Sequence, residues 1–387
     1  MFEIREPAEV DRDAVALVAG MSFNARVNGE DLVLPGSLCT FDAGRVIATA
    51  RAIPLGQWFG GTRLVCAGIA GVAVLPEYRG QGVARDLVRE LLSVERARGV
   101  VVSALYPANA GLYRQLGYEY AGLRPQFRAS VADLPPARGE LREPAEDELD
   151  KVIGCFSRYA SAHNGPVEVL DPGYWADLVL GQRGDGSYPR TVVVPGNDGF
   201  AGYASYYLDN RVGEDYRLAC RHLVALNATA LSSLLGYFRR FQNAAKDLSW
   251  NGPPSMGPVG LSLQSNGFSI VPRVSRWMMR ILDLQQAVEA RGYPEVEGEA
   301  VVAVDDPLFP ENAGPWALRA ASGKVTASRA LNARAKPVPI GLLSALFSGF
   351  ATPNDLVLLG ALEEDDPALG LLSALFSGPV PWMPDAF

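Results

Sequence analysis

The chain has 387 residues, of which 48% are apolar, 20% charged and 9% aromatic, and its 35 basic and 43 acidic residues give a net charge of −8. This length suggests two or three domains, and the composition excludes a disordered, collagen-like or disulfide-dominated protein. The acidic balance argues against a surface that binds nucleic-acid phosphates and fits a cationic small molecule or a basic peptide better.

The sequence indicates no metal site, disulfide framework or membrane span. The four cysteines lie far apart, and the two histidines, His163 and His222, have no partners at metal-ligand spacing, so we expect both histidines to be structural. The N-terminus has no apolar leader, and the longest weakly polar stretch, Leu64 to Pro76, has 13 residues against the roughly 20 that a spanning helix needs. We therefore predict a cytoplasmic protein without a metal.

A strand, a glycine loop and a helix are predicted between residues 72 and 99. Valines alternate in a strand that ends at Pro76, and apolar residues from Ala84 onward recur at helical spacing. A helix N-terminus preceded by Gly80 and Gly82 presents free N–H groups and lets an anion such as a pyrophosphate approach the backbone. The alternative is a tight turn that binds no ligand.

The next predicted strand, Val100 to Leu105, leads into a second motif. The spacing V-x-V-x-P-x-x-R-x-x-G-x-A of the first stretch departs from the Walker and dinucleotide fingerprints and resembles the acetyl-CoA motif of the GCN5-related N-acetyltransferases (GNAT). The second stretch is similar to that superfamily's N-x-x-x-Y-x-x-x-G-[FY] signature, with Asn109, Tyr113, Gly117 and Tyr118 in place. A tyrosine on a short apolar helix is by itself typical of a core residue. The resemblance implies instead that the Tyr113 hydroxyl faces the CoA sulfur.

A repeated segment predicts a domain duplication. Arg5-Glu-Pro-Ala-Glu9 recurs at residues 142–146, and each copy precedes a helical stretch that ends near an Asn-Gly pair. Chance is the alternative in a chain rich in alanine and glutamate, but the matched downstream turn favours duplication. The stretch from Tyr216 to Ala230 in the second copy has no glycine where Gly80 and Gly82 would align. We therefore expect it to bind no CoA and to shape the acceptor pocket.

The C-terminal region differs from the two copies in its predicted secondary structure. Three strand-like runs lie between residues 300 and 330. The segment GLLSALFSG then occurs at 341–349 and again at 370–378. This segment predicts two short amphipathic helices, each ended by a glycine. We interpret residues 286–387 as a third, α+β domain.

The last ten residues, Gly378 to Phe387, are predicted to thread into the protein. Their three prolines favour an extended form, and Trp382, Met383 and Phe387 need burial. The α-carboxylate of Phe387 would then lie in a cleft, where it can accept a proton from an amine directly or through water. The alternative is a tail that only clamps domains or subunits together.

Together these features resemble the enhanced intracellular survival (Eis) family of bacterial N-acetyltransferases. The resemblance covers essentially the whole chain and implies an α/β (α+β) fold, with tandem GNAT domains that have mixed central sheets and a sterol-carrier-protein-like α+β domain. The implied domains are a catalytic domain at 1–136, a degenerate copy at 137–285, and a third domain at 286–387 whose C-terminus enters the active site. Acetyl-CoA is the implied cosubstrate, and family members assemble as homohexamers.

The resemblance also assigns site residues. It implies Tyr113 as the general acid and the terminal carboxylate of Phe387 as the general base, with Phe23 and Asp385 as candidates for binding the acceptor. The implied acetyl-CoA ligands are Val72, Ala73, Val74, Arg79, Gly80, Gln81, Gly82, Val83, Ala84, Arg85, Ala108 and Asn109.

Two positions depart from the family members that acetylate aminoglycosides. Ala25 and Ala386 stand where acidic residues occur in those members, which weakens the case for a polycationic drug unless Asp385 or Glu30 compensates. We expect an N-acetyltransferase that acts on a primary amine, either a small molecule, aminoglycoside-like or another polyamine, or a peptide lysine. The alternative is a non-enzymatic CoA-binding, lipid-binding or scaffolding module with a vestigial site.

Overall fold

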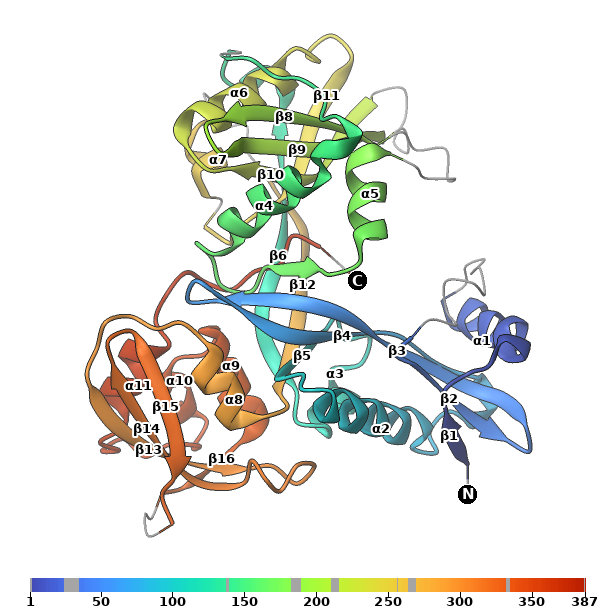
Figure 1. Ribbon diagram of the computed structural model, residues 1–387, viewed down its shortest axis with the longest axis vertical. Helices are drawn as coiled ribbons and strands as arrows, with labels where there is room; N and C mark the ends of the chain where they lie inside the picture. Colours follow the sequence, from blue (N-terminus) through green and yellow to red (C-terminus); the bar gives the residue numbers. More distant parts are fainter. Residues whose placement is uncertain are drawn as a thin grey trace.

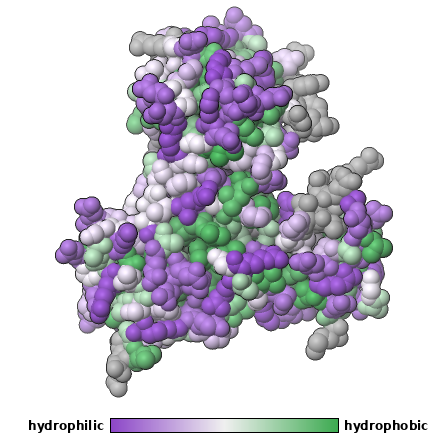
Figure 2. Space-filling model, viewed as in Figure 1, coloured by the Kyte–Doolittle hydropathy of each residue, from purple (hydrophilic) through white to green (hydrophobic). Residues whose placement is uncertain are grey.

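The computed structural model describes residues 2–23, 35–136, 139–181, 189–209, 216–255, 257–263, 269–331, 335–385 and 387. Three lobes meet at a central junction (Figure 1). The first part of the chain forms the lower right lobe, the middle part the upper lobe and the last part the lower left lobe. On this face of the molecule, apolar residues gather around the junction (Figure 2).

A mixed twelve-stranded sheet runs through the first two lobes in the order β1-β2-β3-β4-β5-β12-β6-β11-β10-β9-β8, with β7 paired to β3. The pairs β4–β5 and β10–β11 are parallel and occupy matching positions in the two halves. The strands are β1 (Glu3–Arg5), β2 (Ser37–Asp42), β3 (Arg45–Phe59), β4 (Thr62–Val74), β5 (Val102–Leu105), β6 (Glu119–Ser130), β7 (Val167–Val169), β8 (Arg190–Gly196), β9 (Gly199–Asp209), β10 (Tyr216–Ala225), β11 (Ala245–Asn251) and β12 (Ser269–Ile281).

Amphipathic helices accompany this sheet. The clearest is α2, whose apolar face is buried as its spacing predicted. In the described ranges, no helix combines the length and the apolar character needed to cross a bilayer. The helices are α1 (Arg12–Phe23), α2 (Val83–Ala97), α3 (Ala110–Arg114), α4 (Leu149–Ala160), α5 (Pro172–Leu180), α6 (Ala228–Arg239), α7 (Gly257–Leu261) and α8 (Leu284–Ala290).

The two halves of the sheet exchange a strand. Residues 126–130 of β6, from the first part of the chain, pair with β11, whereas residues 278–281 of β12, from the second part, pair with β5. β6 and β12 also pair with each other and run between the two lobes (Figure 1). The mixed α/β class is therefore confirmed, but the two expected central sheets form one continuous sheet. The boundary predicted at residue 136 divides the chain, but it does not divide the sheet, because β6 before it bonds to β11 and β12 after it.

The repeated sequence builds the same helix start in both halves. In each copy the arginine bonds an acidic side chain six residues later, at 2.9 Å for Arg5 and Asp11 and at 2.6 Å for Arg142 and Glu148. That acidic group also accepts a hydrogen bond from the backbone N–H three residues before it. Helices α1 and α4 follow at once, which is the pattern expected of a duplicated domain.

The third lobe holds a four-stranded sheet in the order β15-β14-β13-β16. The three strands expected from residue 300 onward are present, and the two copies of the repeated segment form α9 and α11. Gly349 ends α9 as predicted, but α11 ends three residues before Gly378. The elements are β13 (Gly298–Asp305), β14 (Gly314–Ala321), β15 (Lys324–Arg329), β16 (Pro337–Pro339), α9 (Ile340–Ser348), α10 (Pro353–Leu358) and α11 (Leu369–Leu375).

A buried ion pair joins the third lobe to the first. Arg280 on β12 donates to both carboxylate oxygens of Asp306 at 2.7 and 2.9 Å, and neither side chain is exposed to solvent. The same guanidinium donates to the carbonyl of Leu116, just after α3. Because a buried charge needs a partner, this pair fixes the third lobe against the end of α3.

Candidate active site

The strand pair β4–β5 opens beside the predicted glycine loop. Residues 66–68 of β4 pair in parallel with residues 102–104 of β5. Beyond Gly68, β4 continues to Val74 bonded to β3, while β5 ends at Leu105. The β4 edge that faces away from β3 therefore presents backbone groups that can bond a ligand.

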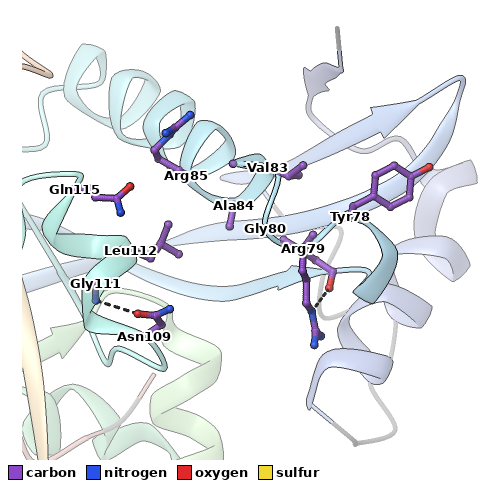
Figure 3. A pocket seen from close by; sticks show the side chains of 12 residues that line it. Tyr78, Arg79, Gly80, Val83, Ala84, Arg85, Asn109, Gly111, Leu112 and Gln115 are labelled. Carbon is purple, nitrogen blue, oxygen red and sulfur yellow. Dashed lines mark hydrogen bonds between the residues drawn. The ribbon is translucent and has the colours of Figure 1, made fainter.

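A cavity of about 500 Å³ lies at the N-terminus of α2, and we call it the cradle (Figure 3). The end of β4, the glycine loop, the first turn of α2 and helix α3 form its walls. The N–H groups of that first turn and the positive end of the helix dipole suit an anionic pyrophosphate. The lining residues are Val74, Tyr78, Arg79, Gly80, Gly82, Val83, Ala84, Arg85, Asn109, Gly111, Leu112 and Gln115.

Two glycines give the loop its shape. Gly80 and Gly82 have φ angles of +77° and +84°, in the left-handed region that residues with a Cβ rarely adopt. A Cβ at Gly80 would meet no protein atom within 4 Å, so the space beside it is open to a ligand. Arg79 Nε donates to the carbonyl of Val74 at 3.1 Å and ties the loop to the end of β4.

Eight of the twelve predicted acetyl-CoA ligands line the cradle, and Val72, Ala73, Gln81 and Ala108 do not. The Gln81 amide donates instead to the carbonyl of Glu77 at 3.0 Å. The sequence interpretation missed four lining residues, Tyr78, Gly111, Leu112 and Gln115. Figure 3 shows Leu112 on α3, and Gln115 directly after that helix, beside the cradle. With Asn109 they are spaced three residues apart, a helical pattern that could have revealed them.

Tyr113, the predicted general acid, lies on α3 and is only 6% exposed. Its ring packs edge-on against Tyr118, with 5.9 Å between the ring centroids. The Tyr118 hydroxyl lies 2.7 Å from Ser103 Oγ, on the part of β5 that pairs with β4. Burial raises the pKa of Tyr113 above its ordinary value, so the phenol stays protonated at neutral pH and can donate a proton.

A second cavity of about 330 Å³ lies where the first two lobes meet, and we call it the acceptor cavity. It contains the ring of Phe387, which lies against Gly68, since a Cβ there would come within 2.6 Å of that ring. Phe387 is thus at the opening between β4 and β5. The lining residues are Pro35, Arg51, Ala52, Ile53, Pro54, Val169, Asp171, Tyr174, Arg221, Asp385 and Phe387.

The tail reaches the acceptor cavity through a series of hydrogen bonds. The Met383 N–H donates to the carbonyl of Leu123 on β6 at 3.2 Å. The Tyr106 hydroxyl, just beyond β5, donates to the carbonyl of Asp385 at 2.8 Å. The Tyr106 ring also packs edge-on against Phe387 at 5.9 Å. The last residues are therefore held at the site rather than left in solvent.

Asp385, a candidate acceptor ligand, is already engaged by the protein. It is 4% exposed, its Oδ2 accepts a hydrogen bond from His222 Nε2 at 2.7 Å, and its Oδ1 lies 3.7 Å from the Arg221 guanidinium. A role in binding the acceptor stays a prediction. The other candidate, Phe23, ends α1, and its side chain lies outside the described residues, as do Ala25, Glu30 and Ala386.

The second half starts its corresponding helix differently. Helix α6 follows β10 and is capped by Asn227, whose Oδ1 accepts a hydrogen bond from the N–H of Ala230 at 2.8 Å. The Asn227 side chain thus bonds a free N–H group of the first turn of α6, whereas at α2 an anion would bond such groups. That the second half binds no CoA stays a prediction.

Comparison with known sequences decides the family. Residues 14–121 and residues 170–281 each match a family described as an acetyltransferase (GNAT) domain, and residues 284–384 match a sterol carrier protein domain. The chain belongs to the GCN5-related N-acetyltransferases. A relative from Streptomyces griseus, called an uncharacterized N-acetyltransferase, is 26% identical over 369 residues, which cover 90% of this chain and 88% of the relative. Another from Streptomyces avermitilis is 25% identical over 92% of this chain and 89% of that protein.

Solved structures show the same three-part architecture. A GCN5-related N-acetyltransferase from Anabaena variabilis superimposes with a TM-score of 0.92 at 26% identity, over all of both chains. One from Kribbella flavida gives 0.88 at 26% identity, over 100% of this chain and 98% of that one. Eis1 from Mycobacterium abscessus has the same fold, with a TM-score of 0.82 at 22% identity over both chains. The predicted tandem acetyltransferase domains and the sterol-carrier-protein-like domain are confirmed by the family matches, and the likeness to Eis1 is one of fold. The hexameric assembly that the Eis resemblance implies stays a prediction.

Replacing Gly80 with alanine tests the cradle. We expect Gly80→Ala to weaken acetyl-CoA binding about tenfold or more, because the methyl group enters the space beside the loop and the left-handed backbone is strained. Isothermal titration calorimetry measures the Kd. The matched control is Gly99→Ala at the other end of α2, where φ is +87° and a Cβ also meets nothing within 4 Å. An equal loss of affinity in both variants would show that strain alone, and not a ligand at Gly80, is responsible.

Proposed function

We propose that this acetyltransferase moves the acetyl group of acetyl-CoA directly to a primary amine in a ternary complex. The position of Phe387 carries the proposal. Its ring contacts Gly68 on the same strand whose end, Val74, lines the cradle. Six residues of extended strand span about 20 Å, a length comparable to the extended pantetheine arm of CoA. A thioester held from the cradle would therefore reach the acceptor cavity.

The cradle fits the pyrophosphate of acetyl-CoA. The backbone around Gly80 and Gly82 and the first turn of α2 would hold its oxygens, and Arg79 and Arg85 bring positive charge to the same wall. When bound, acetyl-CoA supplies an acetyl thioester. The backbone groups of β4 beyond Gly68 would orient its arm.

The terminal carboxylate of Phe387 is the proposed general base. An α-carboxyl group has a pKa of about 3.5, so it is ionised at neutral pH, whereas an alkylamine arrives mostly as an ammonium ion. The carboxylate takes one proton from that ammonium, directly or through water, and frees the lone pair of the nitrogen. The nitrogen then forms the amide bond to the acetyl carbon as the carbon–sulfur bond breaks.

Tyr113 is the proposed general acid. The sulfur leaves with the electron pair of the broken bond and needs a proton to become a thiol. Tyr113 holds a phenolic proton that burial retains at neutral pH, and it lies on the helix that also lines the cradle. The nitrogen loses a second proton as the amide forms, and this proton restores the tyrosinate through water. One proton per turnover therefore leaves through the carboxylate of Phe387, and the thiolate is protonated by a separate group.

The acceptor cavity favours a compact amine over a polycation. Its volume of about 330 Å³ is near the lower end for small-molecule sites. Its lining carries Arg51 and Arg221 but also Asp171, Asp385 and the charged chain end at Phe387, so the small volume, rather than the net charge of the walls, limits the acceptor. A small monoamine or a single lysine side chain fits these conditions better than an aminoglycoside.

An acceptor panel tests this function. Acetyl-CoA is mixed with compact monoamines, a lysine peptide or an aminoglycoside, and CoA thiol release and product mass are measured. We expect amine-dependent release with at least one compact amine or the peptide, at about tenfold higher kcat/KM than with the aminoglycoside, because the discrimination needs only about 1.4 kcal/mol. Preference for the aminoglycoside would overturn the acceptor class. Acetyl-CoA binding without release for any amine would favour the non-enzymatic module.

Tyr113→Phe tests the acid. We expect kcat to fall about a hundredfold, because the variant loses the proton donor, with little change in the KM for acetyl-CoA. Steady-state kinetics at saturating amine give both values. The control is Tyr118→Phe, which removes the neighbouring buried hydroxyl and its contact to Ser103. Normal kcat in Tyr113→Phe together with a lowered melting temperature would assign Tyr113 to packing instead.

A further inference from the structure

His222 is a buried histidine that the proposed chemistry does not use. It lies on β10 in the second half of the sheet and is 2% exposed. Its Nδ1 is 2.7 Å from the hydroxyl of Tyr203 on β9, and its Nε2 donates to Asp385 Oδ2 at 2.7 Å. Both ring nitrogens are thus occupied, one by the second half and the other by the tail.

Aromatic side chains hold this ring in place. Phe156 on α4 stacks on it with the two planes 18° apart, and Trp175 on α5 meets it edge-on, with centroid distances of 5.2 and 5.9 Å. A ring packed on its face and bonded at both nitrogens cannot turn without breaking several contacts. His222 is therefore a fixed point of the second half.

The charge of Asp385 ties the tail to this fixed point. Burial alone would raise the pKa of Asp385, but the charge and hydrogen bond of His222, helped by Arg221, lower that pKa to about 2. Tyr174 on α5 also lowers the pKa of this carboxylate. An ionised carboxylate in this buried position would be costly if it lost its partner, so the tail is strongly favoured to stay at His222.

Asp385 is also close enough to the chain end to set its position. Two residues of extended chain span at most about 7 Å, so the α-carboxylate of Phe387 cannot lie far from the Asp385 anchor. The backbone on the other side of Asp385 is held as well, because Arg124 Nε donates to the carbonyl of Pro384 at 3.0 Å and Tyr106 donates to that of Asp385.

We propose that Tyr203, His222 and Asp385 are positioning residues that hold the terminal carboxylate of Phe387 at the acetyl-transfer site. The second acetyltransferase half, whose described residues form no glycine cradle, would thus act in the reaction by fixing the base that the third domain delivers. The inference rests on the proposed function of that carboxylate.

The central test compares His222→Leu with His222→Gln. Leucine removes the donor to Asp385, whereas the glutamine amide can restore it. We expect His222→Leu to lower kcat about ten- to a hundredfold, because a base displaced by about 1 Å is poorly placed, with the acetyl-CoA Kd changed less than twofold. His222→Gln should recover most of the loss. Equal and full activity in both variants would overturn the proposal.

The pH profile separates positioning from folding. As pH rises toward the pKa of the acceptor amine, less of the amine needs the base, so the activity ratio of His222→Leu to wild type should climb toward one. A folding defect would leave this ratio flat and would overturn the proposal. The titratable or charged groups that face Asp385 and the chain end are His222, Arg221, Tyr174, Tyr203, Tyr106, Arg124, Arg51 and Asp171.

A matched tyrosine pair keeps the proposal falsifiable if His222→Leu folds poorly. Tyr203→Phe removes the hydroxyl that faces His222, whereas Tyr206→Phe removes a buried hydroxyl on the same strand that faces Tyr237 at 2.5 Å. We expect a severalfold fall in kcat for Tyr203→Phe only, and equal kinetics in the two would contradict the proposal.

A chain that ends in a Phe387 carboxamide distinguishes the two possible failures. If this carboxamide chain keeps full turnover, the carboxylate is not the base and the proposed function fails. If it loses turnover while His222→Leu does not, the base stands and only the positioning role of His222 is overturned.

Discussion

The proposed active site of this acetyltransferase depends on where its own last residues are held. The tail leaves the third lobe, and the Trp382 N–H donates to the carbonyl of Asn164 at 3.0 Å while Met383 bonds Leu123 on β6. Trp382 and Met383 are buried, as their composition predicted. The carboxylate of Phe387 is useful as a base only if these contacts form, so all three lobes must be folded before the site is complete.

The strand exchange between β6 and β12 makes the surface on which this tail packs rigid. Because each half of the sheet is completed by a strand from the other, the two halves cannot separate without breaking ladder hydrogen bonds. The buried pair of Arg280 and Asp306 adds the third lobe to the same body and reaches the end of the helix that carries Tyr113. The cradle, the proposed acid and the proposed base are thus fixed relative to one another, which transfer in a ternary complex requires.

Local features of the sequence predicted much of this architecture. The loop at Gly80 and Gly82 could be predicted from the sequence because its left-handed backbone restricts the choice of residue. The repeated Arg-Glu-Pro-Ala-Glu segment could be recognised because the contacts that start the helix after each copy lie within a few residues of sequence. The prolines and aromatic residues of the tail likewise predicted an extended, buried segment.

Long-range contacts were not readable in the same way. Periodicity shows that β6 and β12 are strands but not which neighbours they choose, so the exchange was missed. His222 was expected to stand without a ligand-spaced partner, and the fold brings it to Asp385 across 163 positions of sequence. The residues of the acceptor cavity come together only through the junction of the two halves, so the proposed preference for a compact amine could not be derived from spacing.

The most direct test of the central claim changes only the terminal group. A semisynthetic chain that ends in a Phe387 carboxamide keeps the aromatic ring and every upstream contact but has no terminal charge or basicity. With a compact amine at neutral pH, the proposed mechanism predicts a fall in kcat of about a hundredfold or more, with an unchanged Kd for acetyl-CoA. Wild-type turnover by the carboxamide chain would contradict it.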